Sequence, residues 1–256
     1  MVNVTSFIKY TNLVNNIFKN IYNSEDKFQN VWYCREGKFF MYHENQFPSY
    51  IEISLDYNKI KKTSKGKLTK QAIALKEYIE FFKENKINFR LNSIELYECL
   101  KNKKLITDIK YENNNIIIEK SDGNNLISNF DAFPKEYDFN PKNKLAEFDI
   151  EDNLVEKILD KGNNPFFFIW NFNDIIEDTV NIDDNINYQL GFLRVKLNKK
   201  FIPYLCRKKI NDEEYKYSEL SLELYATDLD GIYDLVFISS FDELTVTSVI
   251  RVLDLV

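Results

Sequence analysis

Few side chains of this sequence could perform acid–base, nucleophilic or metal chemistry. The single histidine, His43, lies in an alternating segment, where a polar residue at a strand end is a simpler interpretation than a general base. The cysteines Cys34, Cys99 and Cys206 are odd in number and too widely spaced to suggest zinc ligands or a disulfide framework. The sequence also lacks a glycine-rich phosphate loop and a Gly-x-Ser-x-Gly motif. We therefore expect a non-catalytic protein with no cofactor and no metal site.

Carboxylates are plentiful but follow no catalytic pattern. Asp228, Asp230 and Gly231 resemble part of a calcium loop, but no glutamate stands at the twelfth position and the flanks alternate like strands, which favours a hairpin turn. Acidic pairs at 177–178 and 183–184 are typical of solvated loops. A glycosidase or a metal-dependent nuclease needs only Asp and Glu at spacings that a sequence does not reveal. A carboxylate-based enzyme therefore stays an alternative.

The cations best suited to binding lie on a predicted helix at residues 4–21. An apolar and aromatic stripe at helical spacing, which includes Phe7, Tyr10 and Phe18, defines its buried side. No Asp or Glu occurs from Val4 to Asn23, and lysine and asparagine can contact phosphates without reading the base sequence. Because Asn and Lys are common throughout the chain, an ordinary solvated face is an equally weighted interpretation. The polar face is expected to carry Lys9, Asn12, Asn15, Asn16 and Lys19, with Thr11 at its edge.

Two further predicted helices carry lysines near their ends. One is expected to start at the N-cap Asn92 and to end near Lys104, and its cations are Lys101, Lys103 and Lys104. The other, with Asp149 as its N-cap, carries Lys157 and Lys161 together with two acids. For this second helix, cations that balance the helix dipole are the simpler explanation. The net charge is −6, and segments such as 212–214 and 242–243 are acidic. We therefore expect an acidic protein whose cations are gathered on one concave surface.

The periodicity predicts an α+β protein built from one repeated unit: a strand, a short helix and an antiparallel meander. Copies are expected at about residues 2–55, 87–130 and 146–205, and a fourth copy near 215–256 has lost its helix. Its clearest hairpin joins 220–226 to 233–239, and 244–255 is the final strand. A helix at 68–84 stands outside this repeat.

Domain boundaries follow from Pro134 and Pro141, which lie among polar residues. We expect a first domain at 1–133 with a helical insertion at about 62–86, a connector at 134–144 and a second domain at 145–256. Apolar residues make up 44% of the chain, enough for a packed core. The longest apolar run, 165–170, is too short to span a bilayer, and no leader is visible. An intracellular, cytoplasmic protein without a membrane partner is expected.

Three parts of the chain resemble the DNA sliding clamps of the two-domain, trimeric type found in tailed phages, archaea and eukaryotes. The first is Ile87-Asn-Phe-Arg-Leu-Asn-Ser-Ile-Glu-Leu-Tyr-Glu-Cys-Leu100, followed by the hairpin segments 106–111 and 116–123. The second is 147–159, which is similar to the opening strand and helix of the second clamp domain. The third is the ending, 231–237 and then 245–255. The resemblance is one of pattern and covers most of the chain, without a diagnostic short motif.

The resemblance implies two similar clamp-like domains, with short helices on antiparallel sheets, in a head-to-tail homotrimeric ring around duplex DNA. Such a ring binds DNA without sequence preference, is loaded by an ATP-dependent clamp loader and is a processivity factor for a DNA polymerase. The DNA-facing residues would be Lys9, Asn12, Asn16, Lys19, Lys101, Lys103, Lys104, Lys157 and Lys161. Partner peptides of this family insert between the domains near the connector, which implies a partner site at Phe130, Phe133, Pro134, Tyr137 and Leu255. The helix at 68–84 and the missing fourth helix depart from the family pattern.

A second interpretation needs no DNA. The same α+β scaffold could serve as a non-catalytic module that binds or inhibits protein partners. In that case, exchanging Lys9 and Lys19 for glutamate would leave its activity unchanged.

Overall fold

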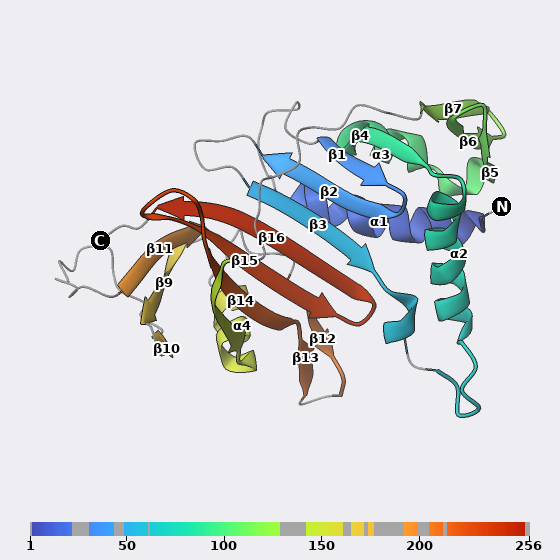
Figure 1. Cartoon of the computed structure of the whole chain (residues 1–256). Helices are drawn as coiled ribbons and strands as arrows, with labels where there is room; N and C mark the ends of the chain where they lie inside the picture. Colours follow the sequence, from blue (N-terminus) through green and yellow to red (C-terminus); the bar gives the residue numbers. More distant parts are fainter. Residues whose placement is uncertain are drawn as a thin grey trace. The chain divides into compact units, whose positions relative to one another are not determined.

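A computed structural model of the chain describes residues 2–21, 31–43, 49–60, 62–128, 142–160, 165–171, 174–176, 192–198, 205–211 and 214–253. Over these residues the protein is α+β, with short helices and antiparallel sheets (Figure 1). It divides into two compact units: unit 1 is 1–43, 52–136 and 242–245, and unit 2 is 44–51, 137–241 and 246–256. No helix among these residues is long and apolar enough to cross a membrane. Most of the predicted connector, 134–144, lies outside the described residues, so the predicted domain boundaries stay a prediction.

Unit 1 holds the helices α1 (Val4–Ile21), α2 (Lys70–Glu84) and α3 (Ser93–Leu100). In one of its sheets the strands have the order β4-β1-β2-β3. These strands are β1 (Val31–Arg35), β2 (Lys38–His43), β3 (Ser49–Leu55) and β4 (Asn88–Asn92). Unit 1 includes β3 from Glu52 onward. The other has the order β5-β6-β7, with β5 (Ile106–Glu112), β6 (Asn115–Lys120) and β7 (Gly123–Ser128). Short 3₁₀ turns, η2 (Tyr57–Lys59) and η3 (Lys103–Leu105), complete the unit. The helices predicted at 4–21 and 68–84 are confirmed.

The core of unit 1 is largely aromatic and centres on Trp32 of β1. The Trp32 ring stacks on Phe18 of α1 at 5.5 Å and meets the edge of Phe89 of β4 at 5.6 Å, measured between ring centroids. Phe7 of α1 in turn stacks on Phe82 of α2 at 6.1 Å. Aromatic pairs in these geometries contribute about 0.5–1.5 kcal/mol beyond the apolar area they bury. The aromatic stripe predicted for α1 therefore fixes that helix against both the sheet and α2.

Unit 2 contains one described helix, α4 (Asp152–Asp160), and a sheet of order β8-β14-β15-β16. Its strands are β8 (Lys144–Ile150), β14 (Glu219–Ala226), β15 (Ile232–Phe241) and β16 (Leu244–Leu253). Smaller sheets have the orders β10-β9-β11, from β9 (Pro165–Asn171), β10 (Asp174–Ile176) and β11 (Phe192–Asn198), and β12-β13, from β12 (Arg207–Lys209) and β13 (Tyr215–Tyr217). The predicted hairpin is confirmed: Leu220 faces Ser239 and Ala226 faces Tyr233.

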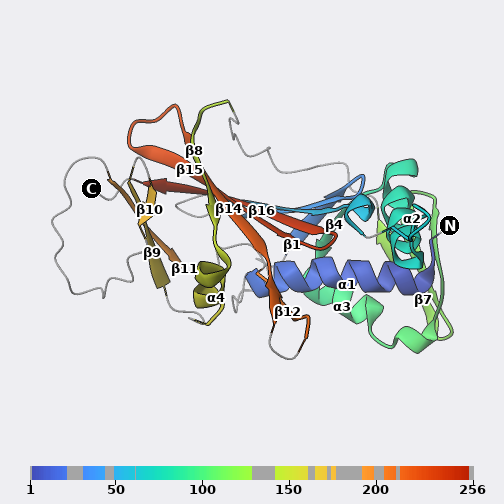
Figure 2. The ribbon, with the colours of Figure 1, turned by 90° about the horizontal axis from the view of Figure 1, so that it is seen from below.

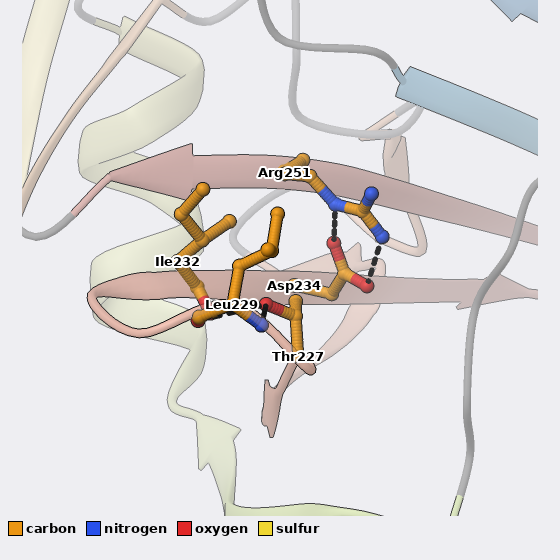
Figure 3. A network of polar contacts seen from close by, with 5 residues as sticks. All are labelled: Thr227, Leu229, Ile232, Asp234 and Arg251. Atoms are coloured by element: carbon orange, nitrogen blue, oxygen red, sulfur yellow. Dashed lines mark hydrogen bonds and ion pairs between the residues drawn. The ribbon is translucent and has the colours of Figure 1, made fainter.

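The two faces of the unit 2 sheet are different in character. One face carries the aliphatic core, in which Val155 of α4 packs with Leu222, Phe237 and Ile250. The other carries Tyr225, Val236 and Val249 and an ion pair in which Arg251 of β16 meets the buried Asp234 of β15 (Figure 3). Asp228 and Asp230 are exposed next to the β14–β15 turn, as expected for a hairpin turn.

The two units repeat one arrangement. In unit 1 the opening strand β4 is followed by the helix α3 and pairs antiparallel with β1, the first strand of the meander β1-β2-β3. In unit 2 the opening strand β8 is followed by α4 and pairs antiparallel with β14, the first strand of the meander β14-β15-β16. The opening strand β4 lies in the predicted copy 87–130, and its meander lies in the copy 2–55. Likewise β8 opens the predicted copy 146–205, and its meander lies in the copy 215–256. The predicted order of strand, helix and meander is present along the chain at 87–130, as β4, α3 and β5-β6-β7, but β4 pairs with β1 of the first copy.

Three local predictions are wrong. The helix after Asn92 ends at Leu100 rather than near Lys104, because Lys101 is extended and Asn102 adopts a left-handed conformation with φ of 61°. Asp149 is not an N-cap, because β8 continues through it and pairs it with Ser221. The third copy is no simple meander, since β9 lies between β10 and β11.

Candidate nucleic-acid interface

The candidate surface lies on unit 1, where α1 and α3 pack against each other (Figure 2). Figure 2 shows both helices on the same side of β1 and β4. The α1 side chains Phe7, Tyr10 and Phe18 are at most 1% exposed, so this helix has only a narrow solvent-facing strip. The start of α3 is stabilised by its N-cap, because the Asn92 side chain accepts hydrogen bonds from the amides of Ile94 and Glu95.

Two residues expected at the polar face or its edge are instead buried. Asn15 is 2% exposed; its Oδ1 accepts a hydrogen bond of 3.0 Å from Trp32 Nε1, and its Nδ2 donates one of 3.1 Å to the Ser93 carbonyl. Thr11 is 1% exposed, with its hydroxyl 3.1 Å from that of Tyr78, whose pKa is raised by burial. Both positions flank the apolar stripe, so partners on other elements can draw them inward. Asn15 joins α1 to β1 and to the start of α3.

The α1 residues that reach solvent are fewer than expected. Lys9 and Asn16 are exposed and Asn12 is half-buried. The Lys9 ammonium lies 4.8 Å from the centroid of the Tyr10 ring, a cation–π contact that orients the lysine. Lys19 belongs to the helix, but its side chain lies outside the described residues. The described part of the strip therefore presents one lysine and amide donors, with no carboxylate from α1.

α3 and η3 add both signs of charge. Lys103 and Lys104 are exposed on the η3 turn, and Lys101 is exposed at the C-cap of α3. Lys101 forms an ion pair with Glu98, so part of its charge is already balanced. Glu95 and Glu98 are exposed on α3 as well. The η3 lysines are consequently the stronger anion-attracting part of this surface.

The remaining predicted site residues are located as follows. Lys157 lies in α4, but its side chain is outside the described residues, and so is the whole of Lys161. The predicted partner-binding residues Phe130, Phe133, Pro134, Tyr137 and Leu255 also lie outside the described residues.

Unit 2 carries a cationic hairpin that the residue pattern did not predict. β12 and β13 pair antiparallel, with Arg207 opposite Tyr217 and Lys208 opposite Lys216. Arg207, Lys208 and Lys209 are all exposed. Three successive cations at 207–209 were the available signal, but the acids at 212–214 led us to expect an acidic loop in this region.

The described residues provide little support for a nucleophilic cysteine or a metal site. Cys34 is fully buried and its pKa is raised by that burial, which disfavours the reactive thiolate. All three cysteines are free thiols. Within the described ranges, no group of three or more His, Cys, Asp or Glu side chains is arranged to hold a metal ion.

Comparisons with known proteins give two likenesses. No protein-family model matches the chain. The chain is 30% identical over 205 residues to a protein of Methanocaldococcus jannaschii described as CRISPR system Cms protein Csm5; the match covers 72% of this chain and 47% of that protein. The chain thus spans about half the length of this relative. Among solved structures, it is similar to the DNA polymerase sliding clamp of Pseudomonas aeruginosa, with 9% identity and a TM-score of 0.38 over 97% of this chain and 63% of that one.

Proposed function

We propose that the chain is a non-catalytic subunit of a ring that encircles duplex DNA, namely a sliding clamp that tethers a DNA polymerase. The observation that carries the proposal is the repeated order of strands, β4-β1-β2-β3 in unit 1 and β8-β14-β15-β16 in unit 2, each with a helix after its opening strand. A ring closes when similar units repeat around an axis through a constant rotation. A chain with two similar units supplies two of the units that repeat around the axis. Three such chains would together supply the units of a homotrimeric ring.

The charges on unit 1 suit a loose hold on DNA. The exposed cations Lys9, Lys103 and Lys104 can contact phosphates, and Asn16 adds an amide donor. Contacts of this kind do not read the bases and depend on counterion release, so they allow movement along the duplex. Glu95 and Glu98 on α3 weaken the attraction, which favours sliding over tight binding.

The proposed partners are the chain itself, duplex DNA, a DNA polymerase and an ATP-dependent loader. Polymerase docking at Phe130, Phe133, Pro134, Tyr137 and Leu255 belongs to the same proposal. These hydrophobic side chains are the type that anchors short peptides in protein interfaces.

Topological retention provides a test without a loader. A linear duplex with biotin at both ends is incubated with the protein, streptavidin is then added to block the ends, and the sample is washed at high salt. A closed ring threads onto open ends and is retained only when the ends are blocked after incubation. Cutting the duplex should then release it. Equal retention on unblocked DNA, or a monomer in sedimentation at micromolar concentration, contradicts the proposal.

Charge variants connect retention to the α1 and η3 surface. The triple change Lys9→Glu, Lys103→Glu and Lys104→Glu should reduce the yield of threaded protein at low salt, because it replaces three exposed cations with anions. The matched control is Lys62→Glu, Lys65→Glu and Lys67→Glu, which alters net charge equally at exposed positions outside this surface. Equal effects of the two triple changes would argue against the surface.

The likeness to Csm5 favours a second candidate, a subunit of a CRISPR complex. In RNA-guided complexes of the Cas9 type, the protein recognises the duplex of guide RNA and target through its backbone and A-form shape. This candidate predicts tighter binding to single-stranded RNA than to duplex DNA of equal length, and no topological retention. Parallel binding measurements with the two nucleic acids at one salt concentration separate the candidates.

A further inference from the structure

The β12–β13 hairpin of unit 2 occupies the position that α1 occupies in unit 1. In chain order, α1 directly precedes β1, the first meander strand of its sheet, and β12–β13 directly precedes β14, the first meander strand of the other sheet. α1 packs beside α3, the helix that follows opening strand β4, and β13 packs beside α4, the helix that follows opening strand β8. Among the described residues, a two-stranded ribbon therefore stands where a fourth helix of the repeat would precede the meander.

The ribbon is attached to the same face of its sheet as α4. Tyr217 of β13 and Leu205 before β12 pack against the core cluster that contains Val155 of α4 and Phe237 of β15. The base of the ribbon is closed by Ser218, whose amide donates to the Cys206 carbonyl at 3.0 Å and whose hydroxyl accepts from the Cys206 amide at 2.7 Å. Figure 2 shows α4 and β12 on one side of the unit 2 sheet. The ribbon is thus a fixed element of this layer.

One face of the ribbon is held toward α4. Side chains on a strand alternate between faces, so Arg207, Tyr215 and Tyr217 share a face. The Arg207 guanidinium lies 4.8 Å from the centroid of the Tyr215 ring and 4.0 Å from the Glu156 carboxylate of α4. A hydrogen bond with Glu156 also raises the pKa of Tyr217. These contacts set the orientation of the ribbon.

The opposite face carries Lys208 and Lys216, which are paired directly across the two strands. The Lys216 ammonium also lies 5.1 Å from the centroid of the Phe241 ring, a cation–π contact that orients this lysine. Lys208 is exposed, and so is Lys209, which by the same alternation lies on the face of Arg207. The carboxylate of Glu214 lies at the turn end of the ribbon and accepts a hydrogen bond of 2.8 Å from Asn211. The cations are therefore concentrated on the paired strands.

We infer that the β12–β13 ribbon is a second DNA-contacting element, which replaces a helix of the proposed ring lining and binds the phosphates of duplex DNA. A two-stranded ribbon fits a groove of B-DNA as an α-helix does, and lysine and arginine on such an element neutralise phosphates. The inference rests on the proposed function and assigns a DNA contact to unit 2, where α4 is the only described helix.

The test measures binding of the full chain to a duplex of mixed sequence by fluorescence anisotropy at several salt concentrations. The double change Lys208→Glu and Lys216→Glu, which alters the two lysines that share a face, should weaken binding roughly tenfold or more. It should also reduce the slope of log K against log salt by about 2, because about one unit of slope is lost per phosphate contact. Lys62→Glu with Lys65→Glu is the control with the same change in net charge, and it should leave the slope unchanged.

The outcomes distinguish this inference from the proposed function. If the wild-type chain binds and is retained on blocked DNA while the ribbon variant matches the control, the ribbon inference is overturned and the clamp proposal stands. If the wild-type chain shows no binding to duplex DNA at low salt, both are overturned. Should the glutamate variant fail to fold by circular dichroism, Lys208→Gln with Lys216→Gln removes the two charges without introducing new ones. That variant must lose the same slope, and an unchanged slope overturns the inference.

Discussion

Arg251 and Asp234 form a two-pronged ion pair across neighbouring strands of unit 2, with Nε 3.0 Å from Oδ1 and Nη2 3.1 Å from Oδ2 (Figure 3). The Asp234 side chain is only 3% exposed, whereas that of Arg251 is 24% exposed. The carboxylate therefore depends on the guanidinium in place of water. Bidentate geometry of this kind is among the strongest arrangements available to an ion pair.

We expect Arg251→Ala to destabilise the protein by about 3–5 kcal/mol, because it takes the compensating guanidinium away from a buried carboxylate. The double change Arg251→Met with Asp234→Leu should cost less than Arg251→Ala, since it removes both charges. Chemical denaturation measures these values. Lys76→Ala, which breaks an exposed pair with Glu80, is the control and should cost about 0.5 kcal/mol or less. A loss under about 1 kcal/mol for Arg251→Ala would show that water reaches Asp234.

Asn15→Leu should destabilise unit 1 by about 2–5 kcal/mol, because it leaves Trp32 Nε1 and the Ser93 carbonyl buried without their amide partner. Urea unfolding followed by tryptophan fluorescence measures the effect. The neighbouring exposed residue provides the control, since Asn16→Leu should change stability by about 0.5 kcal/mol or less. Equal effects at the two positions would refute the interior role of Asn15.

Gly37→Ala should destabilise the protein more than Gly66→Ala. Both glycines have positive φ, 85° and 71°, so both changes carry a backbone cost of roughly 1 kcal/mol. Only at Gly37 would the new methyl group meet a neighbour, the Ile79 carbonyl oxygen of α2 at 3.4 Å. Thermal unfolding of both variants isolates this contact. Indistinguishable midpoints would show that α2 moves away without penalty.

Stability should fall at alkaline pH in part through Tyr225. Burial, followed by a 2.7 Å hydrogen bond from its hydroxyl to Glu223, raises the pKa of Tyr225 to about 12. A pKa that is higher in the folded than in the unfolded state means that the contribution is complete below about pH 10 and is lost as the pH rises toward 12.

Tyr225→Phe should therefore flatten the decline of unfolding free energy between about pH 10 and 12, measured by urea titration at fixed pH values. The exposed Tyr97 supplies the control, and Tyr97→Phe should leave the decline as in wild type. A decline that is unchanged in Tyr225→Phe would contradict the assignment.

Local periodicity was sufficient to predict the elements whose own side chains determine their secondary structure. The aromatic spacing of α1, the apolar stripe of α2 and the alternation of β14 and β15 each predicted the element that the structure contains. Asn15 was assigned to the wrong face because its partners, Trp32 and Ser93, come from other elements. The start of α4 was misjudged for a similar reason, since pairing with β14 extends β8 through Ile150.

The candidate site was less predictable than the fold. Exposed lysines on α1 and η3 follow from amphipathicity, but the pairing of Lys101 with Glu98 depends on side-chain conformation. The strands of the β12–β13 ribbon are only three residues long, too short for an alternating pattern to indicate them. Only its cross-strand pairing and the packing of Tyr217 reveal it as part of the helix layer.

The pairing of each opening strand with the meander of another copy connects stretches that are far apart in the chain. A fragment ending before Asn88 would lack β4 and would leave the β1 edge, Val31–Arg35, without its neighbour. Unpaired edges of this kind recruit other chains. Separately produced halves of unit 1 should therefore associate through the pairing of β4 with β1. Truncating this protein at a boundary between copies would yield fragments that associate through unpaired strand edges, rather than smaller domains that fold independently.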